Sequence, residues 1–455
     1  MDATAAMTAQ PTLSWSPDDP AFWQARGKLV AHRNLWISVP NLLVAFAVWT
    51  LWSGIVVMLP AAGFAFSSTQ LFLLVGMPGL SGAALRVLYG LAATRVEGRR
   101  LTVIATLALL IPALSIGIAV QHPQTPYALM LALAALCGLG GASFASSMTS
   151  LTLLFPRWEL GSALSLNSGL GNLGMSLAQF LTPIVITLSI FGILAGAPLS
   201  VEVRGEPQSL WLQNAGFLWV PAILLCALLA RFGMHEVPLP RQERAGERIY
   251  DQQRYWVLSL LYLGTFGSFL GFTAAVPLFM HTQFPAVDVL QYVFLGPLMG
   301  ALARPLGGWL ADRHGGGRVT LLCFAAMAAG VLLGLGFLPG DQAPGNFWGL
   351  MLAFMVLFVA AGLGSGSMFR IVPEMIEGDR RNPMRGRTLG DAGRVIGLVS
   401  AVGALGGFGV PLLLALALSA SGSVRGSLLM FVFFYLGCML LTWWCHVRER
   451  AGSCW

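Results

Sequence analysis

Charged side chains are scarce in this sequence. Only 10% of its 455 residues are Asp, Glu, Lys or Arg, whereas 56% are hydrophobic. Soluble globular chains carry about 25% charged residues, so this composition excludes an ordinary soluble domain and indicates an integral membrane protein. Lysine is almost missing, with Lys28 as its one representative, so arginine supplies nearly all of the positive charge.

Acidic residues are missing from the interior of every long apolar run. All 19 Asp and Glu residues lie in tails, in loops or at the ends of runs, and no histidine lies in the middle of one. Proton-coupled carriers generally need a titratable relay within the membrane. If the chain carries an anion, as Arg86 and Arg304 within two apolar runs indicate, this absence favours the exchange of one anion for another, although substrate or water as the proton carrier stays open.

The cysteines lack the spacing of metal or redox sites. No nucleophile–base set, metal-ligand cluster or cofactor motif occurs, so we predict no enzyme activity, no metal and no cofactor. The N-terminal stretch has no apolar signal-peptide core, and we interpret it as a cytoplasmic tail. Four cysteines fall in apolar runs and are interpreted as small core residues: Cys137, Cys226, Cys323 and Cys438.

Twelve apolar runs are long enough to cross the roughly 30 Å hydrocarbon core of a bilayer. We therefore predict an all-α membrane protein with twelve transmembrane helices in two six-helix halves. The approximate limits of the runs are 36–60, 68–94, 101–121, 126–153, 160–190, 210–233, 254–280, 288–311, 318–338, 346–372, 393–418 and 424–447. The predicted parts are an N-terminal tail at 1–35, a first half at 36–233, a central loop at 234–253, a second half at 254–447 and a C-terminal tail at 448–455.

The basic residues predict the orientation of these runs. With both termini in the cytoplasm, Arg204 and Arg425 are the two basic residues in outside loops, and the other basic loop residues lie inside. This asymmetry is the positive-inside pattern of membrane proteins. It also accounts for the net charge of +7 without nucleic acid as a partner.

The two halves carry a repeat. Gly82–Thr102 aligns without a gap on Gly300–Thr320, which places Arg86 on Arg304. Internal repeats joined by a charged central loop are typical of secondary transporters, whose substrate binds near the midplane between the repeats. We therefore expect the two arginines at equal depth, related by a pseudo-two-fold axis.

Arg86 and Arg304 are the candidate binding residues. A charge at bilayer depth costs at least a few kcal/mol, and no carboxylate in these runs is available to either arginine. The planar guanidinium donates several N–H groups to a planar oxyanion and stays charged. We predict that a small anion binds between the two charges. The alternative is that each arginine braces helices through backbone carbonyls.

Two glycine-rich segments lie in corresponding runs. The first, Asn167–Gly174, formally matches the dinucleotide fingerprint, but its place inside an apolar run excludes that site. Small residues allow close helix packing, and these helices could also rock against the arginine-bearing helices. The buried amide of Asn172 needs either a protein partner or the anion. The motif glycines are Gly169, Gly171 and Gly174, with Gly403, Gly406 and Gly407 in the second half.

Aromatic and loop residues complete the candidates. Phe144 interrupts a run of small residues, and Tyr262 and Phe266 lie four apart on one helix face. Spacing alone leaves core packing and contact with the anion both open for these three. The loops after the second and eighth runs match each other and are interpreted as a cytoplasmic latch formed by Arg99, Arg100, Asp312, Arg313 and Arg318.

Several segments resemble a known family. Gly307–Arg318 resembles a loop motif of the major facilitator superfamily, and FPRWELGSALSLNSGLGNLG, CGLGGASFASS, LYLGTFGSFLGF and the PGLSGAALR/PLMGALAR pair resemble the nitrate/nitrite porter family of the NarK type. The resemblance covers essentially the whole chain. The family usually has glutamine near Arg370, where an arginine adds charge; its i,i+4 neighbour Glu374 suggests a local ion pair.

The resemblance implies a function and a set of site residues. The family carries nitrate inward and, in one branch, nitrite outward, whereas another branch resembles a nitrate/proton symporter; an anion channel is the more remote alternative. We expect a monomer in the lipid bilayer of the bacterial inner membrane. The implied site consists of two clamping arginines, two rings that sandwich the anion and two further hydrogen-bonding residues: Arg86 and Arg304, Phe144 and Phe266, Tyr262 and Asn172.

Overall fold

The computed structural model describes residues 15–192, 196–203, 206–237, 253–340, 344–378 and 389–447. The remainder of both predicted tails and most of the predicted central loop lie outside the described residues. So do the side chains of Arg370 and Glu374, whose predicted ion pair stays a prediction.

In the described part of the first half, the regular structure is helical apart from one pair of β-strands. Leu199–Val203 (β1) pairs antiparallel with Glu206–Leu210 (β2), with Leu199 opposite Leu210. The sequence analysis does not predict this hairpin. The helices are α1 (Pro20–Phe22), η1 (Trp23–Gly27), α2 (Lys28–Trp49), α3 (Leu51–Met58), α4 (Ser68–Ala93), α5 (Gly98–Ala108), α6 (Leu110–Ala119), α7 (Tyr127–Leu136), α8 (Gly138–Leu154), α9 (Arg157–Val185), α10 (Asn214–Phe217) and α11 (Trp219–Gly233).

The second half is helical in its described part, and several of its spans consist of consecutive helical segments. Pro277 and Pro305 lie inside two of these helices, where a proline removes one backbone hydrogen bond. The helices are α12 (Gln253–Tyr262), η3 (Leu263–Gly267), α13 (Ser268–Gln283), η4 (Val289–Gln291), α14 (Leu295–His314), α15 (Gly316–Phe337), α16 (Phe347–Gly378), α17 (Leu389–Ala404), α18 (Gly406–Ser421), α19 (Arg425–Thr442) and η6 (Trp443–Val447).

Eleven helical stretches of the described chain are long and apolar enough to cross a membrane. Helix α9 adds the twelfth predicted span: its 29 residues extend for about 43 Å along the bundle, although Asn167, Asn172 and Gln179 make it more polar. The prediction of a helical membrane protein with twelve spans is therefore confirmed. The first span begins at Pro20 and not at residue 36, because a helix precedes the apolar run.

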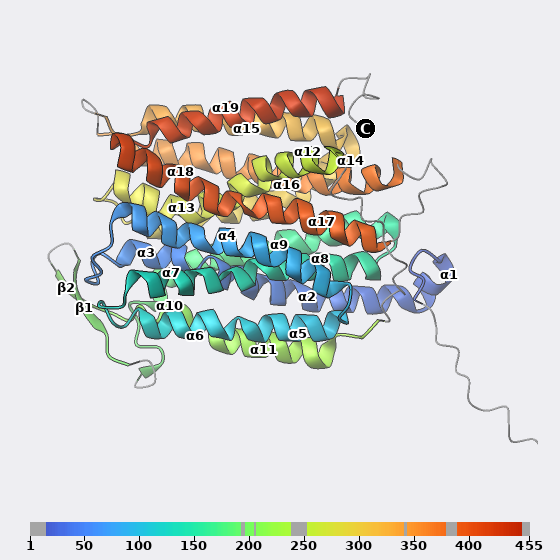
Figure 1. Cartoon of the computed structure of the whole chain (residues 1–455), viewed down its shortest axis with the longest axis horizontal. Helices are drawn as coiled ribbons and strands as arrows, with labels where there is room; N and C mark the ends of the chain where they lie inside the picture. The colour runs from blue at the N-terminus through green and yellow to red at the C-terminus, as the bar shows by residue number, and fades with distance from the viewer. Residues whose placement is uncertain are drawn as a thin grey trace, which may run out of the picture.

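The helices run nearly parallel, so the bundle has two ends (Figure 1). One end carries β1 and β2 and is called the hairpin end. The other end carries α1 and is called the basic end. There the N-terminal segment is tied to the start of α9, because Trp23 Nε1 donates to Glu159 Oε1 at 3.2 Å and Arg157 Nε lies 3.1 Å from Asp18 Oδ2.

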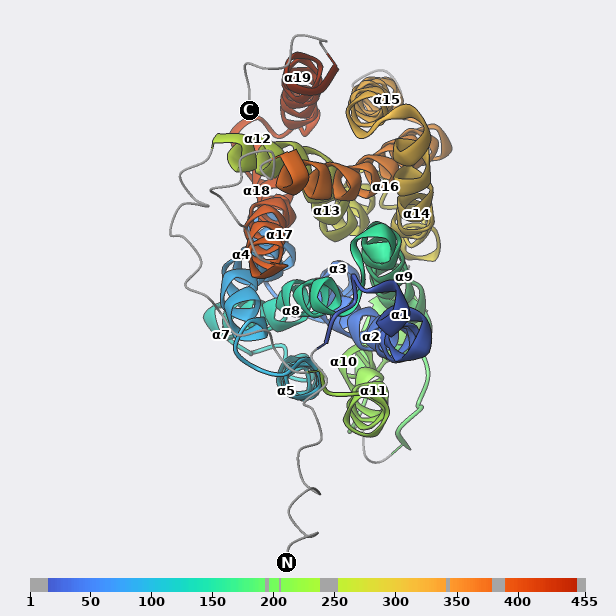
Figure 2. The ribbon, with the colours of Figure 1, turned by 90° about the vertical axis from the view of Figure 1, so that its right-hand side faces the viewer.

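The two halves lie side by side along the bundle, as the view along its axis shows (Figure 2), and α8 and α3 of the first half also contact α17 and α13 of the second. Helix α4 of the first half packs on α17 and α18 of the second, and α9 of the first half packs on α14 of the second. The arginine-bearing helix of each half therefore packs against the helix with the glycine motif of the other half. This arrangement positions the candidate site between the halves.

Candidate anion-binding site

Arg86 lies on α4 and its side chain is fully buried. Nε donates to the Gly141 carbonyl in α8 at 2.9 Å, and Nη1 donates to the Ser400 carbonyl in α17 at 2.7 Å. The second bond crosses from one half of the protein to the other. Nη2 is buried and has no hydrogen-bond partner among the described residues. Arg86 thus braces helices through carbonyls and still has one donor left.

Arg304 lies on α14 and is also fully buried. Its Nη2 donates to the hydroxyl oxygen of Tyr262 at 2.5 Å, within the same half of the protein. Backbone packing around this arginine is tight, because a side chain at Gly366 would overlap the Arg304 carbonyl. The two arginines are therefore equivalent in the repeat but differ in the partners named here: Arg86 reaches a carbonyl of the other half, and Arg304 contacts a tyrosine of its own half.

Aromatic rings lie between the two guanidinium groups. The Cζ atom of Arg86 lies 4.6 Å from the ring centroid of Phe144 and 5.3 Å from that of Phe266. The Cζ atom of Arg304 lies 4.9 Å from the Phe266 centroid. These distances suit cation–π attraction, which partly stabilises a cation in a dry site. Phe266 therefore contacts both arginines, and the two charges approach each other across it.

The rings of Phe144 and Phe266 are nearly parallel, with centroids 6.0 Å apart and planes 20° apart. Tyr262 continues the stack on Phe266 at 5.1 Å and 18°. A flat anion between two rings needs about 7 Å, since each contact takes about 3.5 Å. The predicted sandwich therefore requires the two phenylalanine rings to separate when the anion enters.

Trp49 belongs to the site, although the sequence analysis does not single it out. The Cζ atom of Arg86 lies 5.0 Å from its ring, and its Nε1 donates to the Pro78 carbonyl at 2.8 Å. Side chains at Gly82 or Gly141 would collide with this ring. The chain has 14 tryptophans, and nothing in the sequence distinguishes this one from the others.

Asn172 lies on α9 with 1% of its surface exposed. Neither its amide nitrogen nor its amide oxygen has a hydrogen-bond partner among the described residues. A buried amide without partners costs free energy and is uncommon in native proteins. The sequence leaves open whether this amide pairs with a protein group or with the anion. The described part of the structure supplies no protein partner.

The motif glycines fall into two groups. Gly169 and Gly407 face the opposite half: a side chain at Gly169 would meet Pro305 at 2.9 Å, and one at Gly407 would lie 3.1 Å from Gly79. The others pack within their own half. Gly171 and Gly174 contact Leu42 and Leu43 of α2, whereas Gly403 contacts Tyr262 and Gly406 contacts Gly267. One glycine of each motif thus packs against the helix that carries the other half's arginine.

The predicted latch residues lie at the basic end, where Asp312, Arg313 and Arg318 are exposed. Arg99 contacts Glu236, just after α11, with Nε donating to Oε1 at 2.9 Å, and this hydrogen bond holds the pKa of the Glu236 carboxyl below its usual range. Two further contacts join Arg100 Nε to Glu97 Oε2 at 3.5 Å and Arg313 to the Trp309 ring at 4.0 Å. The latch between the matching loops stays a prediction.

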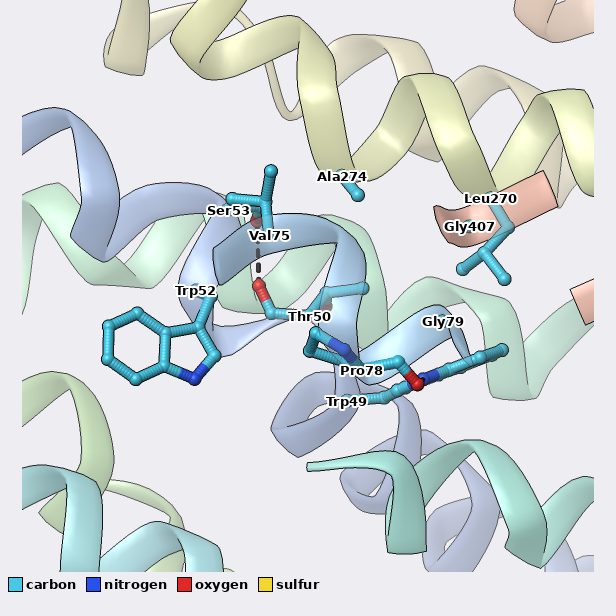
Figure 3. A pocket seen from close by; sticks show the side chains of 10 residues that line it. All are labelled: Trp49, Thr50, Trp52, Ser53, Val75, Pro78, Gly79, Leu270, Ala274 and Gly407. Atoms are coloured by element: carbon cyan, nitrogen blue, oxygen red, sulfur yellow. Dashed lines mark hydrogen bonds between the residues drawn. The ribbon is translucent and has the colours of Figure 1, made fainter. Parts of the chain in front are cut away.

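A small cavity adjoins Trp49 at the interface between the halves, and Figure 3 shows the residues that line it. Both halves line it: Trp49, Ser53 and Val75 come from the first, whereas Ala274 and Gly407 come from the second. Its lining residue Val75 precedes Arg86 on α4, which begins at the hairpin end, so the cavity lies on the hairpin side of Arg86.

Comparison with known proteins agrees with this architecture. The model of the Major Facilitator Superfamily matches residues 41–390. Among solved structures, a D-xylose–proton symporter superposes with a TM-score of 0.65 at 14% identity, over 91% of this chain and 97% of that one. The human organic anion transporter MFSD10 superposes with a TM-score of 0.61 at 16% identity, over 90% and 99%. At these identities the likeness concerns the fold alone.

Curated relatives match along nearly the whole chain. The nitrate/nitrite transporter NarU of Salmonella typhimurium is 43% identical over 451 residues, and that of Escherichia coli is 42% identical over 454 residues. The probable nitrate/nitrite antiporter NarK2 of Thermus thermophilus is 38% identical over 442 residues. Each match covers 96% of this chain and 96% of the relative. The chain therefore belongs to the major facilitator superfamily, and within it to the nitrate/nitrite porter family.

Proposed function

We propose that this protein exchanges nitrate for nitrite across a bacterial inner membrane by alternating access, with the anion held between Arg86 and Arg304. Its relatives include nitrate/nitrite transporters and a probable antiporter. In this proposal the protein works as a monomer, the basic end faces the cytoplasm and both termini are cytoplasmic, as the distribution of arginines favours.

One observation carries the proposal. Two fully buried guanidinium groups from opposite halves contact the ring of Phe266, and no Asp or Glu is buried in the part of the chain whose burial is described. Two like charges in a medium of low dielectric constant repel each other. An anion between them replaces this repulsion by attraction, so the loaded carrier closes more readily than the empty one, which favours exchange.

The available donors suit nitrate and nitrite, which present oxygen acceptors and no donors. Arg86 Nη2 and the Asn172 amide nitrogen are buried and have no partner among the described residues. In this proposal the Tyr262 hydroxyl and Arg304, which are hydrogen-bonded to each other, complete the set of donors. Hydrogen bonds from charged donors to an anion are stronger than neutral ones. Binding therefore uses donors that are already buried and oriented between the halves.

The test is labelled nitrate uptake into proteoliposomes that contain nitrite or no anion substrate, without a pH gradient. Uptake that requires internal nitrite is the expected result. Uptake into empty vesicles that increases with an inward proton gradient would instead establish symport. Discrete conductance steps that do not depend on the anion on the far side would establish a channel. Either of the last two results overturns exchange.

A further inference from the structure

Polar side chains of α9 join the two halves on the hairpin side of the interface. Asn172, Ser176 and Gln179 of α9 follow one another at helical spacings of four and three, so they form one stripe on one face. All three are buried. Ser176 Oγ donates to the Phe294 carbonyl at 2.9 Å, and Gln179 Nε2 donates to the Thr273 carbonyl at 2.7 Å. Ser176 and Gln179 thus contact backbone carbonyls of the second half on the hairpin side of Asn172, and Gln179 Nε2 also donates to Ser53 Oγ of α3 at 3.2 Å.

The carbonyl that Gln179 contacts lacks its usual helical donor. In an α-helix, the carbonyl of residue 273 accepts from the backbone N–H of residue 277. Position 277 is a proline inside α13, which has no N–H. A buried carbonyl without a hydrogen-bond donor is unfavourable, and the amide nitrogen of Gln179, from the other half, supplies the donor that the helix lacks.

Ser176 provides the contrast. The Phe294 carbonyl already accepts a backbone hydrogen bond from the Leu298 N–H at 3.1 Å. The Ser176 hydroxyl is therefore a second donor to a satisfied carbonyl, whereas Gln179 completes an unsatisfied one. The sequence contains no second-half counterpart of this amide in the other contact, where Gly79 of α4 packs directly on Gly407 of α18.

We propose that Gln179 is a positioning residue of the transport cycle, whose hydrogen bond to the Thr273 carbonyl stabilises the state in which the hairpin side is closed. Because Pro277 offers that carbonyl no N–H, the stability of the closed state depends on the amide of Gln179. When the halves separate at this end, water replaces the contact for the Thr273 carbonyl, while the Gln179 amide keeps Ser53 as an acceptor within its own half. The contact is thus made in the closed state and lost in the open state. The inference rests on the proposed alternating access but not on the identity of the anion.

The accessibility of an introduced cysteine to a thiol reagent measures the equilibrium between the closed and open states of the hairpin side. Val75 lines the cavity of Figure 3 and is 3% exposed, so a Val75→Cys variant reacts with a membrane-impermeant maleimide only when the hairpin side opens. The labelling rate in anion-free proteoliposomes reports the open fraction. The protein without the added cysteine, which carries the native cysteines, gives the background rate.

A double-mutant cycle isolates the contact. Gln179→Leu is made with Pro277 present and with Pro277→Ala, which restores an N–H to α13. Replacing an amide by an apolar group changes solvation in both backgrounds, and that change cancels in the cycle. Polar contacts between membrane helices contribute roughly 0.6 to 1.7 kcal/mol. We therefore expect Gln179→Leu to increase labelling about 3- to 18-fold more with Pro277 present than with Pro277→Ala.

Equal effects of Gln179→Leu in the two backgrounds would overturn the inference. Ser176→Ala is the matched control, and it should show no coupling to Pro277→Ala because its acceptor is already satisfied. Should a variant fail to insert, Gln179→Met and Pro277→Ser remove the same donor and restore the same N–H. Because labelling requires no nitrate, failure of nitrate/nitrite exchange leaves this result interpretable, and failure of the coupling leaves the exchange result intact.

Discussion

The amide of Asn172 distinguishes a binding residue from a structural one. Its side chain has no hydrogen-bond partner among the described residues, so replacing it in the empty protein breaks no described bond. Leucine has nearly the same branched shape and leaves no large cavity. Asn172→Leu should therefore leave the melting temperature unchanged or raise it, because it removes a buried polar group without partners.

The same change should weaken anion binding. A hydrogen bond to a charged group contributes about 1.5 to 3 kcal/mol. Even the lower value corresponds to about a 10-fold rise in the Kd for nitrate. The measurements are isothermal titration of purified protein with nitrate and thermal unfolding of the same preparation in the absence of nitrate.

Asn167 on the same helix is the control. Its amide nitrogen donates to Ser147 Oγ at 2.8 Å, and it is as buried as Asn172. Five residues separate the two, so they lie on different faces of α9. Asn167→Leu should lower the melting temperature and leave the nitrate Kd unchanged. An unchanged Kd in Asn172→Leu, or a loss of stability like that of Asn167→Leu, would refute a binding role for Asn172.

Three further predictions concern charge, packing and pH. Arg304→Ala should abolish nitrate uptake in proteoliposomes while the size-exclusion profile and membrane insertion stay unchanged; uptake near the wild-type rate would contradict the clamp. Gly79→Ala should reduce exchange at least 10-fold, because the added methyl group overlaps the Gly407 backbone, whereas Gly409→Ala, which meets nothing within 4 Å, should exchange normally. Since Arg99 lowers the pKa of Glu236, their ion pair stabilises the fold above the ordinary carboxyl value of 4.5 and loses that effect as pH falls through the lowered pKa. The melting temperature of Glu236→Gln should therefore lack this part of the decrease at acidic pH. Identical pH profiles of melting temperature for the variant and the wild type would contradict the prediction.

The sequence predicts the features that depend on long-range composition. Hydropathy locates the spans, because each must bury about 20 apolar residues. The gapless repeat around Arg86 and Arg304 predicts their correspondence in the two halves. Helix α9 is harder to recognise as a membrane span, because its amides and glycines reduce its hydropathy. Its length and its place in the repeat nevertheless indicate a span.

The specific side-chain contacts of the site could not be predicted from the sequence. The bond from Arg86 to the Ser400 carbonyl has a backbone acceptor, which any residue type supplies. Trp49 resembles many other tryptophans of the spans. The contact of Gln179 had two signals, an amide in an apolar run and a proline in another, but their pairing required the packing of α9 on the second half. The clamp on the anion remains a prediction.

Trp49 gives the protein an intrinsic optical probe. Its indole lies beside the guanidinium of Arg86, at a place where an anion would change the local electric field. Indole emission responds to nearby charge, so the difference spectrum between the protein and a Trp49→Phe variant isolates one emitter from the 14 tryptophans. Anion arrival could then be followed by stopped-flow fluorescence, without a radioactive label and on the timescale of a single turnover.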